Sequence, residues 1–403
     1  MVVTSAFSQL ECSGDELTRT IKFMPPLYKQ RYLFVKQLVS KHKPKKVADL
    51  GCAECRLLWM LKFCSCIEVL VGLDISEDVM KENMHTLSPL PGDYLQPSER
   101  RLTVILYQGS VAHKDPCMLG FDMITCVEVI EHLEAEELDK FPEVVFGFMS
   151  PAMVVITTPN SEFNCLLPTV TLFRHPDHKF EWNRAQFKNW AQDVAARYDY
   201  TVEFTGLGAP PPEKDVGTCT QIGVFVRKYQ NDGPTHFEKS FRPYAVIPTF
   251  LPFLTYNSHY LTLCSLFKAE YPSLKDEKYL QTAVVNEVIW TAQIIARRLW
   301  DHVKSEYKKP CYDSETEPKF QTSHHSLKYF KHLPLTEANN KSLQPFINGN
   351  SVYIPLANIF SFPKVNKLCG TVETLSNLIT GKVALSHDGS AVLIDMFLPN
   401  YFD

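Results

Sequence analysis

The stretch VADLGCAE at residues 47–54 decides the fold, because a short apolar run ends there in a turn of small residues. A second apolar run at residues 68–76 contains Asp74 near its end. A strand that leads through a small-residue turn into a helix is typical of the first unit of a nucleotide-binding α/β sheet. The strict GxGxxG pattern is absent, since Ala53 and Cys55 stand where glycines are expected, so this turn alone is weak evidence.

Apolar runs alternate with helical patterns on both sides of this turn. The runs cover residues 47–50, 68–76, 102–110, 121–129 and 153–159, and the helical patterns cover residues 27–41, 56–63 and 77–85. This alternation predicts a parallel α/β sheet with both faces covered. Two consecutive runs, 200–206 and 221–229, predict an antiparallel pair at the end of the sheet. Seven strands with this ending predict the Rossmann-like fold of class I S-adenosylmethionine-dependent methyltransferases.

Three parts are predicted along the chain: an N-terminal tail at residues 1–25, a methyltransferase domain at 26–230, and a less regular C-terminal region of unassigned role at 231–403. In the last part, apolar residues recur every three or four positions and predict a helix over residues 273–304. Residues 383–385 and 391–396 flank a turn at residues 387–389 and predict a β-hairpin. The polar residues 310–350 predict a flexible loop.

Composition limits the class of protein. Of the 403 residues, 45% are hydrophobic and 21% are charged, so the chain can bury a sizeable core. The net charge of −4 argues against a surface coated with positive charge for duplex DNA. No apolar run is long enough to span a membrane, and no secretory signal is visible. These features predict a cytoplasmic protein that does not bind a membrane.

The twelve cysteines of such a protein are expected to be reduced thiols. Cys52 and Cys55 form a CxxC pair, and Cys64 and Cys66 follow shortly after, so a zinc site is the alternative. The first pair lies in a strand-to-helix turn and the second follows a helical run, unlike the two knuckles of a zinc ribbon. Buried thiols are therefore the favoured interpretation.

The small-residue turn and the acid after the second run predict a cofactor site. Asp74 lies about 20 residues beyond Gly51, the separation at which an acid accepts hydrogen bonds from ribose hydroxyls. A dinucleotide needs a glycine-rich turn for its pyrophosphate, whereas S-adenosylmethionine has no phosphate and suits this glycine-poor turn. We expect Asp49, Gly51 and Asp74 to bind S-adenosylmethionine, and Ser110 to contact its adenine side. A helix N-cap or surface acid is the alternative for Asp74, and an ordinary turn serine for Ser110.

A second cluster follows the fourth run. If the chain turns helical at Glu128, then Glu128, Glu131 and His132 lie at i, i+3 and i+4 on one face, where they can bind a divalent cation. A Glu-His-Leu sequence also occurs at this place in many metal-free methyltransferases. Because strand ends at one edge of a parallel sheet converge, His178 in the loop after the fifth run can complete a site of two glutamates and two histidines. His175 competes for that position and is less favoured, and solvent exposure is the alternative for both.

Taken together, these motifs resemble the small-RNA 3′-terminal 2′-O-methyltransferases of the Hua-enhancer type. The resemblance rests on EVIEH at residues 128–132, TPN at 158–160, DHKFEW at 177–182, Phe187, Trp190, and YTVEFTG at 200–206. It covers residues 26–230, and it is nearest to the animal form that acts on Piwi-associated RNAs. The long N-terminal RNA-binding modules of plant members have no counterpart in this sequence, which points to single-stranded RNA as the substrate.

The resemblance implies methyl transfer from S-adenosylmethionine to the 2′-hydroxyl of the 3′-terminal nucleotide, which protects that end. In that family a metal binds the terminal 2′- and 3′-hydroxyls. Carried over to this sequence, the metal ligands and catalytic residues are Glu128, Glu131, His132 and His178. The imidazoles favour Mn²⁺ and cellular abundance favours Mg²⁺, so the metal is open, as is the general base. Binding of both hydroxyls explains a need for a free RNA 3′ end.

The residues around the predicted metal loop have two interpretations each. Arg174, Lys179 and Arg184 either contact the last phosphates or form a solvated charged face. Trp182 and Phe187 either stack on a base or, as we favour, pack in the core.

The resemblance also carries expectations about partners and place. A Piwi-type protein is expected to present the RNA 3′ end, in the cytoplasm or in germ-line RNA granules, to a monomer of this chain. Two other functions are left open. A methyltransferase acting on a small molecule would keep the cofactor site but have no use for His178. A non-catalytic interaction protein would have no reason to keep several mutually repelling acids.

Overall fold

The computed structural model describes residues 21–167, 173–228, 263–307 and 344–396. The chain forms two compact units, Met1–Pro89 with Arg100–Tyr271 and Leu90–Glu99 with Pro272–Asp403, which we call the sheet unit and the C-terminal unit. This division differs from the predicted boundary at residue 230, because a strand at Cys264–Glu270 pairs with the sheet. Most of the predicted tail, residues 1–20, lies outside the described residues.

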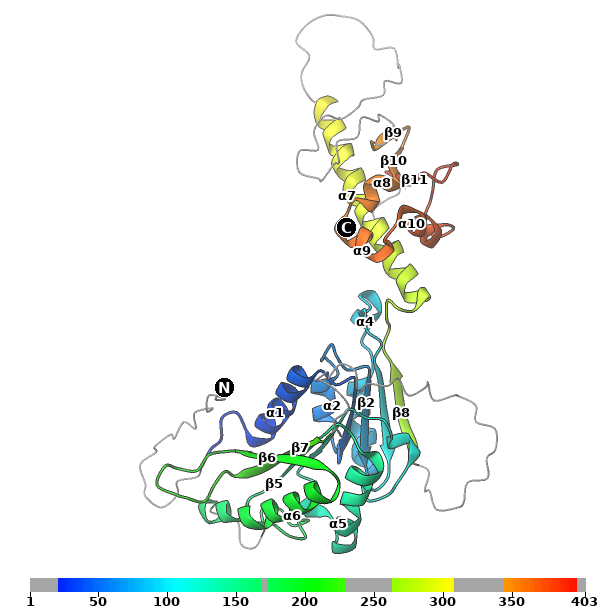
Figure 1. Cartoon of the computed structure of the whole chain (residues 1–403). Coiled ribbons are helices and arrows are strands. Elements are labelled where there is room, and N and C mark those ends of the chain that lie inside the picture. Colours follow the sequence, from blue (N-terminus) through cyan, green and yellow to red (C-terminus); the bar gives the residue numbers. More distant parts are fainter. Residues whose placement is uncertain (1–20, 168–172, 229–262, 308–343, 397–403) are drawn as a thin grey trace, which may run out of the picture. The chain divides into compact units, whose positions relative to one another are not determined.

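The sheet unit is built on eight strands in the order β6-β7-β5-β4-β1-β2-β3-β8 (Figure 1). Their bounds are β1 Lys46–Leu50, β2 Val69–Asp74, β3 Thr103–Gln108, β4 Met123–Val127, β5 Met153–Pro159, β6 Tyr200–Leu207, β7 Thr220–Arg227 and β8 Cys264–Glu270. Strands β1 to β5 pair in parallel, and β6, β7 and β8 join antiparallel. The methyltransferase-type α/β fold is confirmed, but the predicted count of seven strands is wrong, because β8 extends the sheet beside β3.

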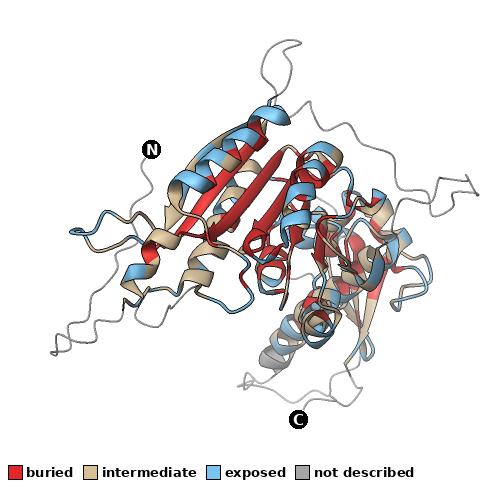
Figure 2. Cartoon of the chain, turned by 90° about the horizontal axis from the view of Figure 1, so that it is seen from below, coloured by how far each residue is buried: buried red, intermediate tan, exposed pale blue. Residues whose placement is uncertain are grey.

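Helices cover both faces of this sheet. Their bounds are α1 Leu27–His42, α2 Arg56–Leu61, α3 Glu77–Asn83, α5 Ala135–Pro142 and α6 Arg184–Arg197, with a π-helical turn, η4, at Glu143–Met149. Successive residues of a strand point to opposite faces, so Val47 packs in the core beneath α1 and α2 while Ala48 packs in the core beneath α5 and α6. Figure 2 shows the buried strands between helices whose outer sides are exposed.

The C-terminal unit has its own core. It contains α4 Pro91–Leu95, α7 Glu277–Tyr307, β9 Phe346–Asn348, β10 Ser351–Pro355, α8 Leu356–Phe360, α9 Pro363–Cys369, α10 Val372–Ile379 and β11 Ala391–Asp395, with the strands in the order β11-β10-β9. The long predicted helix is confirmed as α7, which buries Val284, Val288 and Ala292. Within the described ranges no helix, α7 included, is both long and apolar enough to cross a membrane.

Two local predictions for this unit are corrected. Strand β11 pairs mainly with β10. The predicted hairpin is present only as a short antiparallel contact, in which Leu385 bridges Val392 and the N–H of Leu393 donates to the carbonyl of Ala384 at 2.9 Å. The turn at residues 387–389 therefore connects the end of the helical region to a strand whose main partner lies earlier in the chain. Of the predicted loop at 310–350, residues 310–343 lie outside the described residues, and the remainder contains β9.

Removal of a core aromatic ring is expected to destabilise the sheet unit. Phe146 in η4 is fully buried, and its ring centroid lies 5.1 Å from that of Tyr200 and 4.9 Å from that of Phe225. Phe146→Ala should lower the free energy of unfolding by about 3–5 kcal/mol, measured by urea unfolding followed by circular dichroism. Trp59→Ala is the matched control, because this ring on α2 is exposed, and it should cost less than about 1 kcal/mol. Equal losses would contradict the assignment of the core.

Candidate active site

The cofactor turn follows β1. The N–H of Gly51 donates to the carbonyl of Leu73 at 2.7 Å, and the φ of Gly51 is 75°. A Cβ at this position would lie 2.4 Å from Cγ2 of Val129, so a side chain is excluded. Ala53 and Cys55 also have positive φ, 41° and 59°. The turn thus has the backbone shape for which glycines are usually used, although Ala53 and Cys55 adopt it here.

Asp74 ties the ends of β1 and β2 together. Its Oδ2 accepts from the N–H of Ala53 at 2.8 Å, and its Oδ1 accepts from the N–H of Ser76 at 2.8 Å. Ser76, not Asp74, is the N-cap residue of α3, so the N-cap alternative for Asp74 is wrong. Because Asp74 binds the cofactor turn directly, it is in place to fix the shape of that turn.

The two other predicted cofactor residues lie near the carboxyl ends of β1 and β3, on either side of β2. Asp49 is buried, its Oδ1 accepts from Thr125 Oγ1 at 2.6 Å, and burial raises the pKa of Asp49 to about 7. Ser110 donates its hydroxyl to Glu137 Oε1 at 3.1 Å and accepts from the N–H of Ala112 at 3.2 Å. The adenine contact predicted for Ser110 stays a prediction.

Glu128 lies directly after β4 and is bound to the neighbouring strand β5. Its N–H donates to the carbonyl of Thr157 at 3.0 Å, and its Oε1 accepts from Thr157 Oγ1 at 2.8 Å. Glu128 has a φ of 56°, in the left-handed region. The expectation of a helix from Glu128 is therefore wrong. The following 3₁₀ turn, η3, covers only Ile130–His132, so Glu128 does not share a helical face with Glu131 and His132.

Arg31 belongs to the same site and was not identified from the sequence. Its Nη1 lies 3.3 Å from Glu128 Oε2 and donates to Thr220 Oγ1 at 3.2 Å. Its Nε is buried without a hydrogen-bond partner. Arg31 comes from α1, far from Glu128 in the sequence, so no local spacing signals this ion pair.

Glu131 is a buried carboxylate with one oxygen unused. Its Oε2 accepts from Thr158 Oγ1 at 3.0 Å, whereas its Oε1 is buried without a hydrogen-bond partner. Burial and then the charge of Glu128 raise the pKa of Glu131 well above its usual range. A cation at this oxygen would satisfy the unused acceptor and stabilise both carboxylates.

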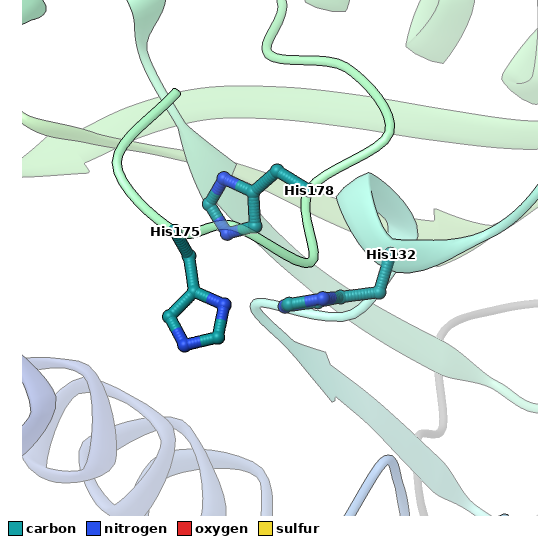
Figure 3. Close-up of side chains that lie close together, drawn as sticks. All are labelled: His132, His175 and His178. Atoms are coloured by element: carbon teal, nitrogen blue, oxygen red, sulfur yellow. The ribbon is translucent and has the colours of Figure 1, made fainter. Parts of the chain in front are cut away.

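Three histidines from two separate segments of the chain lie close together (Figure 3). His132 ends η3, and His175 and His178 lie in the loop before α6; one potential ligand atom of each lies within 4.8 Å of the others. The ring centroids of His132 and His178 are 4.8 Å apart. Burial, followed by the charges of His178 and His175, lowers the pKa of His132, so its ring is neutral at pH 7 and can bind a cation.

The loop after β5 therefore reaches His132, as expected, and it brings His175 as well as His178. The N–H of Lys179 donates to the carbonyl of Glu131 at 2.8 Å and ties this loop to η3. Glu128 and Glu131 are not part of the histidine group. The assignment of Glu128, Glu131, His132 and His178 as ligands stays a prediction, and it is supported by the unused oxygen of Glu131 and the neutral ring of His132.

The cationic side chains around the loop are paired within the chain. Arg174 donates to the carbonyls of Asn160 and Cys219, so it holds the loop and is not part of a solvated face. Lys179 pairs with Glu134 at 2.8 Å, and Arg184 with Glu162 at 2.7 Å. These two pairs fit the solvated charged face.

The aromatic and cysteine alternatives are also decided by burial. Phe187 is buried in the core and Trp182 packs against that core, so the core interpretation holds for both.

The CxxC pair lies in the interior. Cys52 and Cys55 are buried, and hydrogen bonding with Cys55 and burial raise the pKa of Cys52 well above its usual value. Among the described residues, no group of three or more close metal-binding side chains contains a cysteine. Buried thiols therefore account for the CxxC pair.

Comparison with known proteins identifies the family of this chain. The sequence profile described as the HENMT1 C-terminal domain matches residues 278–396, within the C-terminal unit. A small RNA 2′-O-methyltransferase from Gallus gallus is 62% identical over 95% of this chain and 97% of its own length. One from Xenopus tropicalis is 49% identical over 94% and 98%. The solved methyltransferase domain of bacterial CtHen1-C is 35% identical and covers 50% of this chain and 100% of its own, with a TM-score of 0.43. Identity at this level over nearly the whole length of both chains shows that this chain belongs to the small RNA 2′-O-methyltransferases.

Proposed function

We propose that this chain transfers the methyl group of S-adenosylmethionine to the 2′-hydroxyl of the 3′-terminal nucleotide of small single-stranded RNAs. One observation carries the proposal beyond family membership: a cofactor turn and a group of cation-binding side chains follow neighbouring parallel strands of one sheet. In open α/β sheets, ligands bind at the carboxyl ends of such strands, where the strand order reverses. That reversal lies here between β4 and β1.

The ligand set proposed for a divalent cation consists of Glu128, Glu131, His132 and His178. The donor chemistry fits Mn²⁺ or Mg²⁺, since it combines carboxylate oxygens with imidazole nitrogens and includes the unused Oε1 of Glu131. When bound, such an ion lowers the pKa of a sugar hydroxyl and fixes its position.

The residues of this chain have separate tasks in the proposed reaction. Asp74 holds the turn that receives S-adenosylmethionine, through its bond to the N–H of Ala53. Arg31 and Thr157 hold the two carboxylate oxygens of Glu128. His132 is exposed and therefore accessible to an RNA end, and its neutral ring can accept a cation or a proton at a ring nitrogen.

The partner and the location are part of the proposal. A Piwi-type protein presents the RNA 3′ end to a monomer of this chain, in the cytoplasm or in germ-line RNA granules. The support is the resemblance of residues 26–230 to the animal form of the family. The net charge of −4 is consistent with a partner that holds most of the RNA, because this chain has no overall attraction for a polyanion.

Metal removal should abolish the reaction. We expect a short single-stranded RNA, incubated with the protein, S-adenosylmethionine and Mn²⁺ or Mg²⁺, to become resistant to periodate oxidation and β-elimination, because a 2′-O-methyl group removes the terminal diol. Added EDTA should leave the RNA sensitive. RNAs with a 2′-deoxy or a 3′-phosphate end should accept no methyl group from labelled S-adenosylmethionine. Methylation that persists in EDTA, or that these altered ends support, would contradict the proposal.

A further inference from the structure

A buried glutamate lies against the ring of His178. Nδ1 of His178 is 2.6 Å from Oε1 of Glu181, and both side chains are almost completely buried. The N–H of Arg174 also donates to Glu181 Oε1, at 2.6 Å, and Asn164 Nδ2 donates to Glu181 Oε2, at 2.6 Å. Glu181 therefore accepts hydrogen bonds through both oxygens.

These bonds specify which nitrogen of His178 carries the proton. Glu181 already accepts two N–H groups, and an ionised carboxylate can only accept, so Nδ1 of His178 is the donor in the third contact. A neutral imidazole has one N–H, and Nε2 of His178 then keeps its lone pair. A histidine that donates one nitrogen to a carboxylate and offers the other to a metal is a common arrangement in metal sites.

The orientation of Glu181 is itself held by a closed set of contacts. Asn164 Oδ1 accepts from Arg174 Nε at 2.6 Å, so the amide of Asn164 cannot be reversed without loss of that bond. Arg174 also donates to Cys219 O at 2.7 Å, which anchors the set to the residue before β7. The side chain of Glu181 thus has one favourable placement, and that placement is against His178.

His175 lacks such support. Its Nδ1 accepts from the N–H of Asp177 at 3.3 Å, so a neutral His175 carries its proton on Nε2. Its side chain is about half exposed, in contrast to the buried ring of His178. The two neighbouring histidines therefore hold opposite tautomers, and only that of His178 leaves Nε2 free.

We propose that Glu181 is a positioning residue that holds His178 as the Nδ1–H tautomer, with Nε2 free to bind the divalent cation. This inference rests on the proposed function for the ligand role of His178 and for the identity of the bound ion. It also decides between the two loop histidines, because Glu181 prepares His178 and not His175 as the ligand.

The tautomer can be measured without any variant. Long-range ¹H–¹⁵N correlation spectra of the metal-free protein, with the His178 signals identified by their loss in His178→Ala, should show Nδ1 protonated and Nε2 unprotonated. A His178 ring protonated at Nε2 with a free Nδ1 would overturn the proposal.

Removal of the carboxylate should weaken the binding of Mn²⁺ alone. Glu181→Gln keeps the shape of the side chain but has a single acceptor oxygen and no negative charge, so its NH₂ donor must face either Asn164 Nδ2 or the Nδ1–H of His178. We expect its Mn²⁺ affinity, measured by electron paramagnetic resonance, to fall by about 10- to 100-fold. S-adenosylmethionine affinity should be unchanged, which also checks that the variant is folded. Glu203→Gln removes an exposed carboxylate on β6 and is the matched control, with no change expected.

The outcomes separate this inference from the proposed function. If Glu181→Gln binds Mn²⁺ as tightly as the unaltered protein, the positioning role is wrong, whatever the activity. If the unaltered protein shows the expected tautomer and Mn²⁺ binding, and Glu181→Gln loses that binding, the inference stands even if no RNA is methylated. If Glu181→Gln does not fold, the tautomer measurement on the unaltered protein decides.

Discussion

His178→Ala is expected to lower the rate of methyl transfer to an RNA 3′ end by about 100-fold or more, while the affinity for S-adenosylmethionine stays nearly unchanged. The substitution removes the only ring nitrogen that Glu181 prepares for a cation. It also removes the contact of that ring with His132. The cofactor turn is held separately by Asp74 and is not touched by this change.

Methyl transfer and cofactor binding must both be measured on the same protein preparation. Methyl transfer is followed with labelled S-adenosylmethionine and RNA, and cofactor binding by calorimetry. His175→Ala is the matched comparison, because it removes a neighbouring imidazole from the same loop and the same histidine group. We expect a smaller loss of activity in His175→Ala, since its ring is half exposed and its Nδ1 is used by Asp177. An equal or larger loss of activity in His175→Ala would contradict the assignment of His178, and not His175, as the cation ligand.

Asp74→Ala is expected to weaken the binding of S-adenosylmethionine while the rate of methyl transfer at saturating cofactor stays nearly unchanged. Its carboxylate accepts two backbone N–H groups, one from the cofactor turn and one from the start of α3. A hydrogen bond to a charged acceptor contributes about 1.5–3 kcal/mol, and only the bond to Ala53 lies in the cofactor turn, so its loss should raise the Kd for S-adenosylmethionine by about 10- to 100-fold. At saturating S-adenosylmethionine, methyl transfer should recover most of its rate, because the histidines and glutamates are unchanged.

The control for Asp74→Ala is Asp78→Ala, which removes an exposed acid from the first turn of α3 and should leave the Kd unaltered. Titration of S-adenosylmethionine in the RNA assay separates a change in KM from a change in kcat. If Asp74→Ala and His178→Ala lose cofactor affinity equally, the division of the site into a cofactor part and a cation part is wrong.

The strand pattern was predictable because a strand buried on both faces is marked in the sequence by a local run of apolar residues. The run at residues 153–159 coincides with β5, every residue of which is buried, as the apolar character of a central parallel strand requires. The predicted start of α1 at Leu27 is also confirmed, because Pro26 immediately precedes the helix and the apolar residues of α1 recur at helical spacing. The prediction failed at β8, since a single apolar stretch does not specify which edge of a sheet it joins.

The sequence by itself therefore determined the α/β methyltransferase fold, the cofactor turn and the types of side chain that can hold a cation. Only the tertiary structure decided how those side chains are held. The left-handed conformation of Glu128 accompanies a bond to Thr157 on the adjacent strand, and its ion pair comes from Arg31 on α1. The tautomer of His178 depends on Glu181, which in turn depends on Asn164 and Arg174. These contacts join segments that are separate in the sequence, and hydrogen-bond direction arises only when folding brings them within reach.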